Sequence, residues 1–210
     1  MFHAQEWLKS LVNQELDVSE LNIALERVEK DVKQIPVILK FLDRGQEEFL
    51  PLVTKCGERW IRMIATHKTE KEVLSQLVDV CLAITKVEEG VDLILFGKEP
   101  DTLTLLIELM DLYPLRLEFQ ILRLFNNVGS TKGTKLGEML LQNPAVIHQF
   151  VERLGCCKVP YIRNELILLL RILTKGNQEI QKIVAFGDGF RFLLGIIEEE
   201  GGSNGTEVVL

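Results

Sequence analysis

Residues 102–128 read TLTLLIELMDLYPLRLEFQILRLFNNV, and residues 145–174 read AVIHQFVERLGCCKVPYIRNELILLLRILT. In each stretch a short apolar segment is followed by a longer one that opens at a proline, Pro114 or Pro160. Apolar residues recur every three or four positions, which is the period of a helix with one buried face, and proline suits the first helical turn. The prolines are 160 − 114 = 46 residues apart, within the range of about 40–47 for armadillo and HEAT repeats. The two stretches therefore predict helical repeats.

Helical periodicity continues on both sides of these stretches. We expect a helix capped by Ser19, a short one at 37–42, and others at 71–86, 135–142, 179–186 and 189–199. Gly90 is expected to separate helices, and the polar stretch 129–133 to be a flexible connector. Because one repeat cannot bury its apolar face alone, the repeats must stack. The expected fold class is all-α, an armadillo/HEAT-like right-handed α-solenoid of about four to five units.

We expect one domain over residues 1–200, with divergent N-terminal repeats in 1–90 and regular repeats in 101–200. The apolar stripe of Phe2, Trp7, Leu8, Leu11 and Val12 is expected to cap the first repeat instead of docking a membrane or a partner helix. Residues 201–205 predict a loop, and 206–210 the beginning of a truncated helix. Apolar residues of the 189–199 helix should then be partly exposed and cause weak self-association.

The charge disfavours two classes of partner. With 24 Lys and Arg against 31 Asp and Glu, the net charge is −7, which repels nucleic acid and makes any membrane association indirect. Four cysteines without a C-x-x-C spacing indicate a reducing compartment, hence the cytoplasm. The first twenty residues show no secretory signal, and the longest apolar run, Leu166–Leu170, is far short of the roughly 20 residues of a membrane span.

Motifs that carry chemistry are weak in this sequence. His3, His67 and His148 are far apart, and no nucleophile elbow or zinc-protease motif occurs. The stretch from Gly129 lacks the residue order of a phosphate-binding loop. The adjacent Cys156 and Cys157 have only Lys158 as an evident cationic neighbour, so we expect no catalytic role for them. The sequence predicts no enzyme, no cofactor and no metal site.

The candidate partner-binding residues lie on the two long helices. On the first they are Arg116, Gln120, Arg123 and Asn127, and on the second Arg163, Asn164, Arg171 and Lys175. Arg116 matches Arg163 at 163 − 116 = 47 residues, and Arg123 matches Arg171 at 171 − 123 = 48. We therefore expect two stacked arginine pairs that bind carboxylates of a protein partner. The alternative is a solvated face whose arginines pair with local glutamates.

Three segments in order resemble the head of the general vesicular transport factor family: IRNE at 162–165, IQKIVAF at 180–186 and EEGGSNG at 199–205. Residues 102–128 fit the preceding family repeat more loosely, and residues 1–90 match only in helical character. The family consists of Golgi vesicle-tethering proteins with an armadillo-like head and a coiled-coil tail; the sequence shows no heptad segment.

The resemblance implies a peripheral protein of Golgi or ER-Golgi membranes that docks transport vesicles. Its implied partners are Rab-type GTPases, SNAREs and other tethering factors. The alternative function is that of a generic armadillo-repeat adaptor for cargo or ubiquitin-ligase recruitment. An enzyme would require a pocket with convergent polar groups, which this sequence does not indicate.

Overall fold

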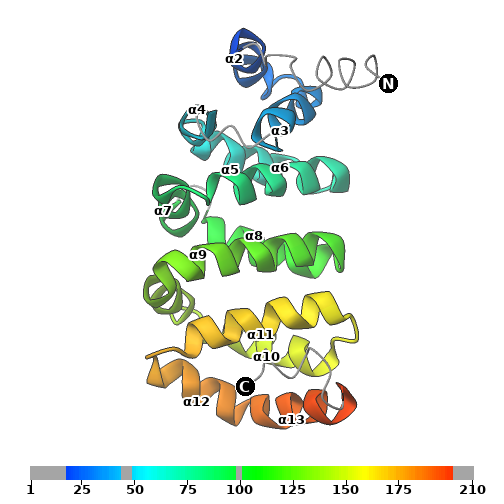
Figure 1. Cartoon of the computed structure of the whole chain (residues 1–210), viewed down its shortest axis with the longest axis vertical. Coiled ribbons are helices and arrows are strands. Elements are labelled where there is room, and N and C mark those ends of the chain that lie inside the picture. Colours follow the sequence, from blue (N-terminus) through cyan, green and yellow to red (C-terminus); the bar gives the residue numbers. More distant parts are fainter. Residues whose placement is uncertain (1–17, 44–48, 98–100, 201–210) are drawn as a thin grey trace, which may run out of the picture.

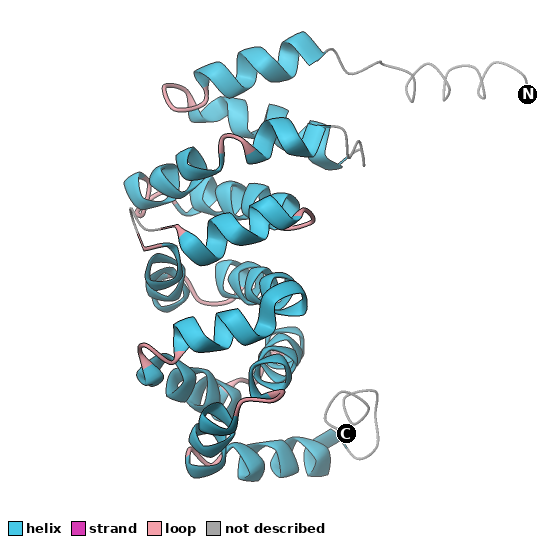
Figure 2. Cartoon of the chain, turned by 90° about the vertical axis from the view of Figure 1, so that its left-hand side faces the viewer, coloured by secondary structure: helices cyan, strands magenta, loops and turns pink. Residues whose placement is uncertain are grey.

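The computed structural model describes residues 18–43, 49–97 and 101–200. Within these ranges the regular elements are helices and no strand occurs (Figure 2). The predicted N-terminal stripe, the 201–205 loop and the 206–210 helix start lie outside the described residues. In chain order the helices are α2 (Val18–Arg27), α3 (Ile35–Asp43), α4 (Leu50–Thr54), α5 (Gly57–Thr66), α6 (Lys71–Ile84), α7 (Glu88–Phe96), α8 (Thr102–Leu112), α9 (Arg116–Leu140), α10 (Pro144–Cys156), α11 (Pro160–Thr174), α12 (Gln178–Phe186) and α13 (Gly189–Glu200), with a 3-10 turn η1 (Val32–Gln34) before α3.

The helices stack along one axis in sequence order, from α2 at one end to α12 and α13 at the other (Figure 1). A ladder of four helices runs through the stack, because α3 packs on α6, α6 on α9, and α9 on α11. The remaining helices flank this ladder, each in contact with neighbours close in sequence. Contacts restricted to adjacent units are typical of a solenoid. The predicted all-α, armadillo-like class is confirmed.

Helix α9 serves two repeats. Its backbone bends at Lys132, which has non-helical angles of φ −132° and ψ 46°. Residues before the bend close the repeat formed with α7 and α8, whereas those after it open the next repeat, completed by α10 and α11. The bend is held because the Lys132 ammonium pairs with Asp92 at 2.5 Å and with Glu88 at 3.1 Å. The expectation of a flexible connector at 129–133 is therefore wrong, since the segment is helical.

Three described helices, α4, α5 and α7, were not expected from the sequence. Gly90, interpreted as a separator, lies inside α7 and is buried. A Cβ atom at Gly90 would lie 2.0 Å from the carbonyl oxygen of Ile84, so only glycine lets α7 approach the end of α6 this closely. The glycine therefore marks tight packing between helices, and it does not mark a break in the chain.

The apolar core runs continuously from α2 to α13. Trp60 of α5 is fully buried, and its indole N–H donates to the carbonyl of Val53 at 2.9 Å. Phe125 of α9 and Phe150 of α10 meet with ring centroids 6.2 Å apart, which joins two consecutive repeats. None of the described helices has the length and apolarity needed to cross a bilayer.

Candidate partner-binding surface

The eight predicted partner-binding residues separate into three groups. Arg116, Arg123, Arg171 and Lys175 are exposed, as expected, and Asn127 and Asn164 are half-buried. Gln120 and Arg163 are buried, with exposed fractions of 7% and 8%. The expectation that all eight lie outside the core is therefore wrong for these two.

Gln120 is buried because its amide joins α9 to α6. The amide oxygen accepts a hydrogen bond from the Ser75 hydroxyl at 2.9 Å, and the amide nitrogen donates to the Ser75 carbonyl at 3.2 Å and to Asp79 at 2.5 Å. These bonds satisfy the buried polar atoms of Gln120. In the described structure Gln120 connects two repeats and does not face a partner.

Arg163 faces α13, where its guanidinium lies 3.8 Å from the carboxylate of Glu199. The buried apolar positions of α9 and α11 match at a shift of 45 residues: Leu117 with Ile162, Ile121 with Leu166, Leu124 with Leu169 and Val128 with Leu173. This register makes Glu118 the equivalent of Arg163, and Asn126 the equivalent of Arg171.

The predicted stacking of Arg116 over Arg163 and of Arg123 over Arg171 is therefore wrong. It used shifts of 47 and 48 residues, taken from the positions of the arginines, whereas the buried positions match at 45. Pro160 is the first residue of α11, but Pro114 precedes α9, which begins at Arg116. The prolines consequently occupy different positions relative to their helices, so their spacing of 46 residues does not give the register of the buried faces either.

A different cluster forms where α9 meets α11. The rings of Phe119 and Tyr161 pack edge to face, with centroids 5.1 Å apart. The Arg123 guanidinium lies 5.7 Å from the centroid of Phe119, within the range of a cation–π contact. Arg116 lies one helical turn before Phe119 and lines a cavity of about 380 Å³ together with Lys71, Glu72, Ser75 and Leu117. We call Arg116, Phe119, Arg123 and Tyr161 the aromatic–arginine patch.

The two aromatic residues of this patch were missed because both fit the apolar pattern of their helices. Phe119 is half-buried, whereas Tyr161 is 49% exposed. A signal existed for Tyr161. It directly follows Pro160 in the first turn of α11, where few residues of the same helix cover a side chain.

An acidic group from α6 borders the patch. Burial raises the pKa of Asp79, whereas the hydrogen bond from Gln120 and the charges of Arg116 and Arg123 lower it. The net shift is upward, so burial dominates. Asp79 accepts a hydrogen bond from Gln120, and its single charge offsets the two arginines only in part. The patch therefore presents positive charge beside exposed aromatic surface.

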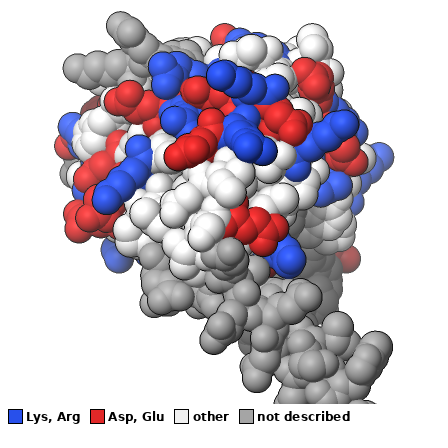
Figure 3. Space-filling view, turned by 90° about the horizontal axis from the view of Figure 1, so that it is seen from above, with Lys and Arg blue, Asp and Glu red and all other residues white. Residues whose placement is uncertain are grey.

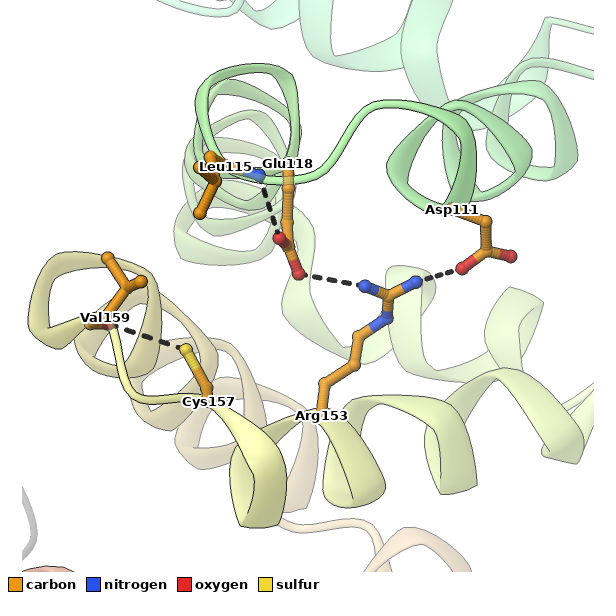
Figure 4. A network of polar contacts seen from close by, with 6 residues as sticks. All are labelled: Asp111, Leu115, Glu118, Arg153, Cys157 and Val159. Atoms are coloured by element: carbon orange, nitrogen blue, oxygen red, sulfur yellow. Dashed lines mark hydrogen bonds and ion pairs between the residues drawn. The ribbon is translucent and has the colours of Figure 1, made fainter.

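A polar network fixes the beginning of α9 and hence the position of the patch (Figure 4). Arg153 of α10 donates to Glu118 of α9 at 2.9 Å and also binds Asp111 of α8. The second oxygen of Glu118 accepts from the backbone N–H of Leu115 at 3.3 Å, which caps α9. Leu115 has φ of 75°, a strained value for a branched residue. The network thus holds the sharp turn that directs the helix.

The described surface shows no continuous basic face at the end near α2. Lys and Arg side chains alternate there with Asp and Glu side chains (Figure 3). Within the described ranges no three His, Cys, Asp or Glu side chains are grouped in a way that could hold a metal ion.

The chain is similar in sequence to proteins of vesicle transport. It is 28% identical over 168 residues to "General vesicular transport factor p115" of Homo sapiens. This match covers 72% of this chain and 17% of that protein. It is 36% identical over 115 residues to "Golgin candidate 6" of Arabidopsis thaliana, covering 55% of this chain and 12% of that protein. It is 35% identical over 109 residues to "Intracellular protein transport protein USO1" of Saccharomyces cerevisiae, covering 52% and 6%. The chain thus spans less than a fifth of these relatives.

The fold is shared with two solved structures. Crystal structures of Uso1-1 and Uso1-2 superpose with TM-scores of 0.74 and 0.76, at 19% and 20% sequence identity. They cover 90% and 93% of this chain, and the chain covers 34% of each. No family model matches the sequence. The sequence matches support a relationship to the general vesicular transport factor family, and the two solved structures show that the solenoid fold is shared.

Proposed function

We propose that the chain is a protein-binding scaffold that docks transport vesicles in ER-to-Golgi or intra-Golgi traffic. The observation that carries the proposal is the 28% identity over 168 residues to the human general vesicular transport factor. The docking unit is the single helical domain expected over residues 1–200. Since the chain spans 17% of that relative, the proposal concerns one protein contact in tethering.

The contact is made through the aromatic–arginine patch. Tyrosine and arginine dominate the residues that contribute most to protein–protein affinity, because they combine apolar area with directed hydrogen bonds. The exposed Tyr161 supplies the apolar anchor, and Arg116 and Arg123 supply guanidinium groups for carboxylates. The partner is therefore a protein segment with an apolar side chain flanked by Asp or Glu. Asn127, Asn164, Arg171 and Lys175 are secondary contacts in this proposal.

The partners that the family resemblance implies are Rab-type GTPases, SNAREs and other tethering factors. The chain would act in the cytoplasm, peripherally on Golgi or ER-Golgi membranes. Its net charge of −7 disfavours direct adsorption to anionic lipid. Membrane attachment in this proposal is therefore indirect, through proteins on the vesicle surface.

Flotation with Golgi-enriched membranes tests the proposal. The double variant Arg116→Glu with Arg123→Glu, and the single variant Tyr161→Ala, should each reduce membrane-bound protein about 10-fold. The matched control is Arg62→Glu with Lys182→Glu, which changes the net charge equally at two exposed sites on α5 and α12. The control should bind like the unaltered chain.

Two results would contradict the proposal. If the patch variants and the control bind membranes equally well, the aromatic–arginine patch takes no part in the contact. If the unaltered chain binds protein-free liposomes of the same lipid composition as well as it binds the Golgi-enriched membranes, its partner is lipid and not protein. If neither result is obtained, purified Rab-type GTPases and SNAREs are added one at a time as competitors. The protein that reduces membrane binding of the chain is then identified as its partner.

A further inference from the structure

The fold brings more positive charge to the adjacent cysteines than the sequence indicates. Cys156 ends α10, and Cys157 follows it. Both line a cavity of about 600 Å³ between α10, α11 and α13. Lys158, Arg163 and Arg191 line the same cavity, and Glu199 is the one carboxylate among its described lining residues. Arg163 lies on the next helix, 163 − 156 = 7 residues further on, whereas Arg191 is 191 − 156 = 35 residues away and is brought here by the fold.

The cysteines differ in accessibility. Cys156 is exposed, whereas Cys157 is half-buried and its thiol donates to the Val159 carbonyl at 3.5 Å. Cys81 is fully buried, and burial raises the pKa of its thiol to about 12, which makes it unreactive. Cys156 is therefore the thiol of this cavity that a dissolved reagent reaches first.

The charges around the cavity favour an anion. Arg163 is 8% exposed, and the Glu199 carboxylate at 3.8 Å is on a side chain that is 75% exposed. Arg191 pairs with Asp188 at 3.1 Å, and both side chains are mostly exposed, so solvent weakens that pair. Three cations and one carboxylate line the described part of the cavity, and Asp188 pairs with Arg191, so the cations outnumber these two carboxylates by one beside the Cys156 thiol.

We propose that Cys156 is a site of S-thiolation by small anionic disulfides, of which oxidised glutathione is the representative. The Cys156 thiolate attacks one sulfur of the disulfide, the disulfide bond breaks, and a Cys156–glutathione disulfide forms. The second glutathione leaves as a thiolate and takes a proton from water. The Cys156 sulfur is oxidised and the leaving sulfur is reduced, so no other oxidant is needed. Lys158, Arg163 and Arg191 hold the carboxylates of the attached group.

Two features favour retention of the attached group. A disulfide between adjacent Cys156 and Cys157 would be strained, so Cys157 is poorly placed to expel glutathione. Gly155 lies against Phe192 of α13, because a Cβ atom at Gly155 would be 2.5 Å from that ring. An adduct on the next residue therefore lies beside α13 and changes the surface that this helix presents.

The test measures the modification rate of the full chain at low ionic strength with two reagents, oxidised glutathione and the cationic disulfide cystamine. Peptide mass mapping should find glutathione on Cys156, and Cys156→Ser should abolish that product. Lys158→Gln with Arg191→Gln should slow the glutathione reaction about 3- to 10-fold and speed the cystamine reaction. High salt should remove both differences, because it screens exposed charges.

Cys56 provides the matched internal control. It is half-buried in a cavity lined by Lys55, Arg59 and Arg62, but Arg59 and Arg62 both pair with Glu29. Cys56→Ser should leave the rate at which glutathione modifies Cys156 unchanged. Preferential modification of Cys56, or equal rates for the charge variants and the unaltered chain, would overturn the proposal.

Discussion

Glu118 and Arg163 occupy equivalent positions in consecutive repeats, 163 − 118 = 45 residues apart, and both are buried. Glu118 pairs with Arg153 of α10 at 2.9 Å, and Arg163 pairs with Glu199 of α13 at 3.8 Å. Arg153 and Glu199 are 199 − 153 = 46 residues apart. The same contact between neighbouring repeats is thus made twice, with the charges exchanged. Exchanged charges favour each repeat's own neighbour over other repeats.

The first prediction concerns the Glu118–Arg153 pair. Arg153→Glu should lower the free energy of unfolding by about 2–4 kcal/mol, because it leaves the carboxylate of Glu118, whose side chain is 10% exposed, beside a like charge. Urea unfolding followed by far-UV circular dichroism measures the change. The double variant Glu118→Arg with Arg153→Glu, which copies the charges of the next repeat, should recover part of the loss.

The exposed pair of Lys68 and Glu108 is the control for this prediction. It also joins two repeats, at 2.9 Å, but its side chains are 41% and 53% exposed. Lys68→Ala should therefore cost less than about 1 kcal/mol. A cost for Arg153→Glu no larger than that of Lys68→Ala would show that the Glu118–Arg153 pair contributes little to stacking.

The second prediction concerns Asp79, whose pKa is raised above 3.8 mainly by burial. The folded chain keeps this proton at pH values at which the unfolded chain has lost it, so the contribution of Asp79 to stability falls as pH rises through this window. Asp79→Asn should raise the free energy of unfolding at about pH 7 by less than about 1 kcal/mol, since Asp79 is only half-buried and solvent screens its charge. The gain should shrink towards about pH 4.

Asp92→Asn is the control for the Asp79 experiment, because Asp92 binds Lys132 at 2.5 Å and its charge is favourable. This variant should lower stability at about pH 7. Unfolding measurements at both pH values show whether each variant raises or lowers the free energy of unfolding. A loss of stability in Asp79→Asn at neutral pH would mean that the neighbouring arginines outweigh burial.

The fold could be predicted where helices are long and begin near a proline, as α10 and α11 do. Short helices such as α4 and α7 were missed because packing against neighbouring helices, and not a long apolar period, defines them. Gly90 was interpreted from the sequence as a helix breaker, whereas in the fold it allows close contact between α7 and the end of α6. The resemblance to the vesicular transport factors could be predicted from the segments in α11 and α12, and the relatives confirm it. The surface could be predicted only in part. Whether Gln120 is exposed depends on Ser75 and Asp79, residues of another repeat that periodicity within one helix does not reveal.

The third prediction compares two helical glycines. A Cβ atom at Gly129 of α9 would lie 2.8 Å from the Cγ2 atom of Ile172 in α11, whereas one at Gly195 of α13 would meet nothing within 4 Å. Gly129→Ala should cost about 1–3 kcal/mol, because branched Ile172 has little freedom to move in its helix. Gly195→Ala should instead stabilise by up to about 1 kcal/mol through helix propensity.

Thermal unfolding followed by circular dichroism measures both glycine variants. In an Ile172→Ala background the cost of Gly129→Ala should largely disappear, because the contacting methyl group is gone. A cost that persists in this background would assign the effect of Gly129 to the bend at Lys132 and not to the approach of α11.

The last prediction concerns the apolar surface on α12 and α13. Phe186, Phe190 and Leu194 are 86%, 63% and 60% exposed, and exposure of the last two was expected from the sequence. Phe190 also lines a cavity of about 310 Å³ with Leu154, Ile167 and Leu193. Clustered apolar surface of this kind favours association, and we expect weak self-association, with a dissociation constant above about 1 µM.

Phe190→Ser with Leu194→Ser should abolish that association in sedimentation velocity experiments over a range of concentrations. The unfolding free energy should change by no more than roughly 0.5 kcal/mol per site, because these side chains are mostly in water already. Leu112→Ser on α8 is the control, since Leu112 is 59% exposed at a different site. It should leave association unchanged. Two results would contradict this prediction: the double variant still associates, or Leu112→Ser abolishes association equally well. In either case the exposed side chains of α13 have no specific role in self-association.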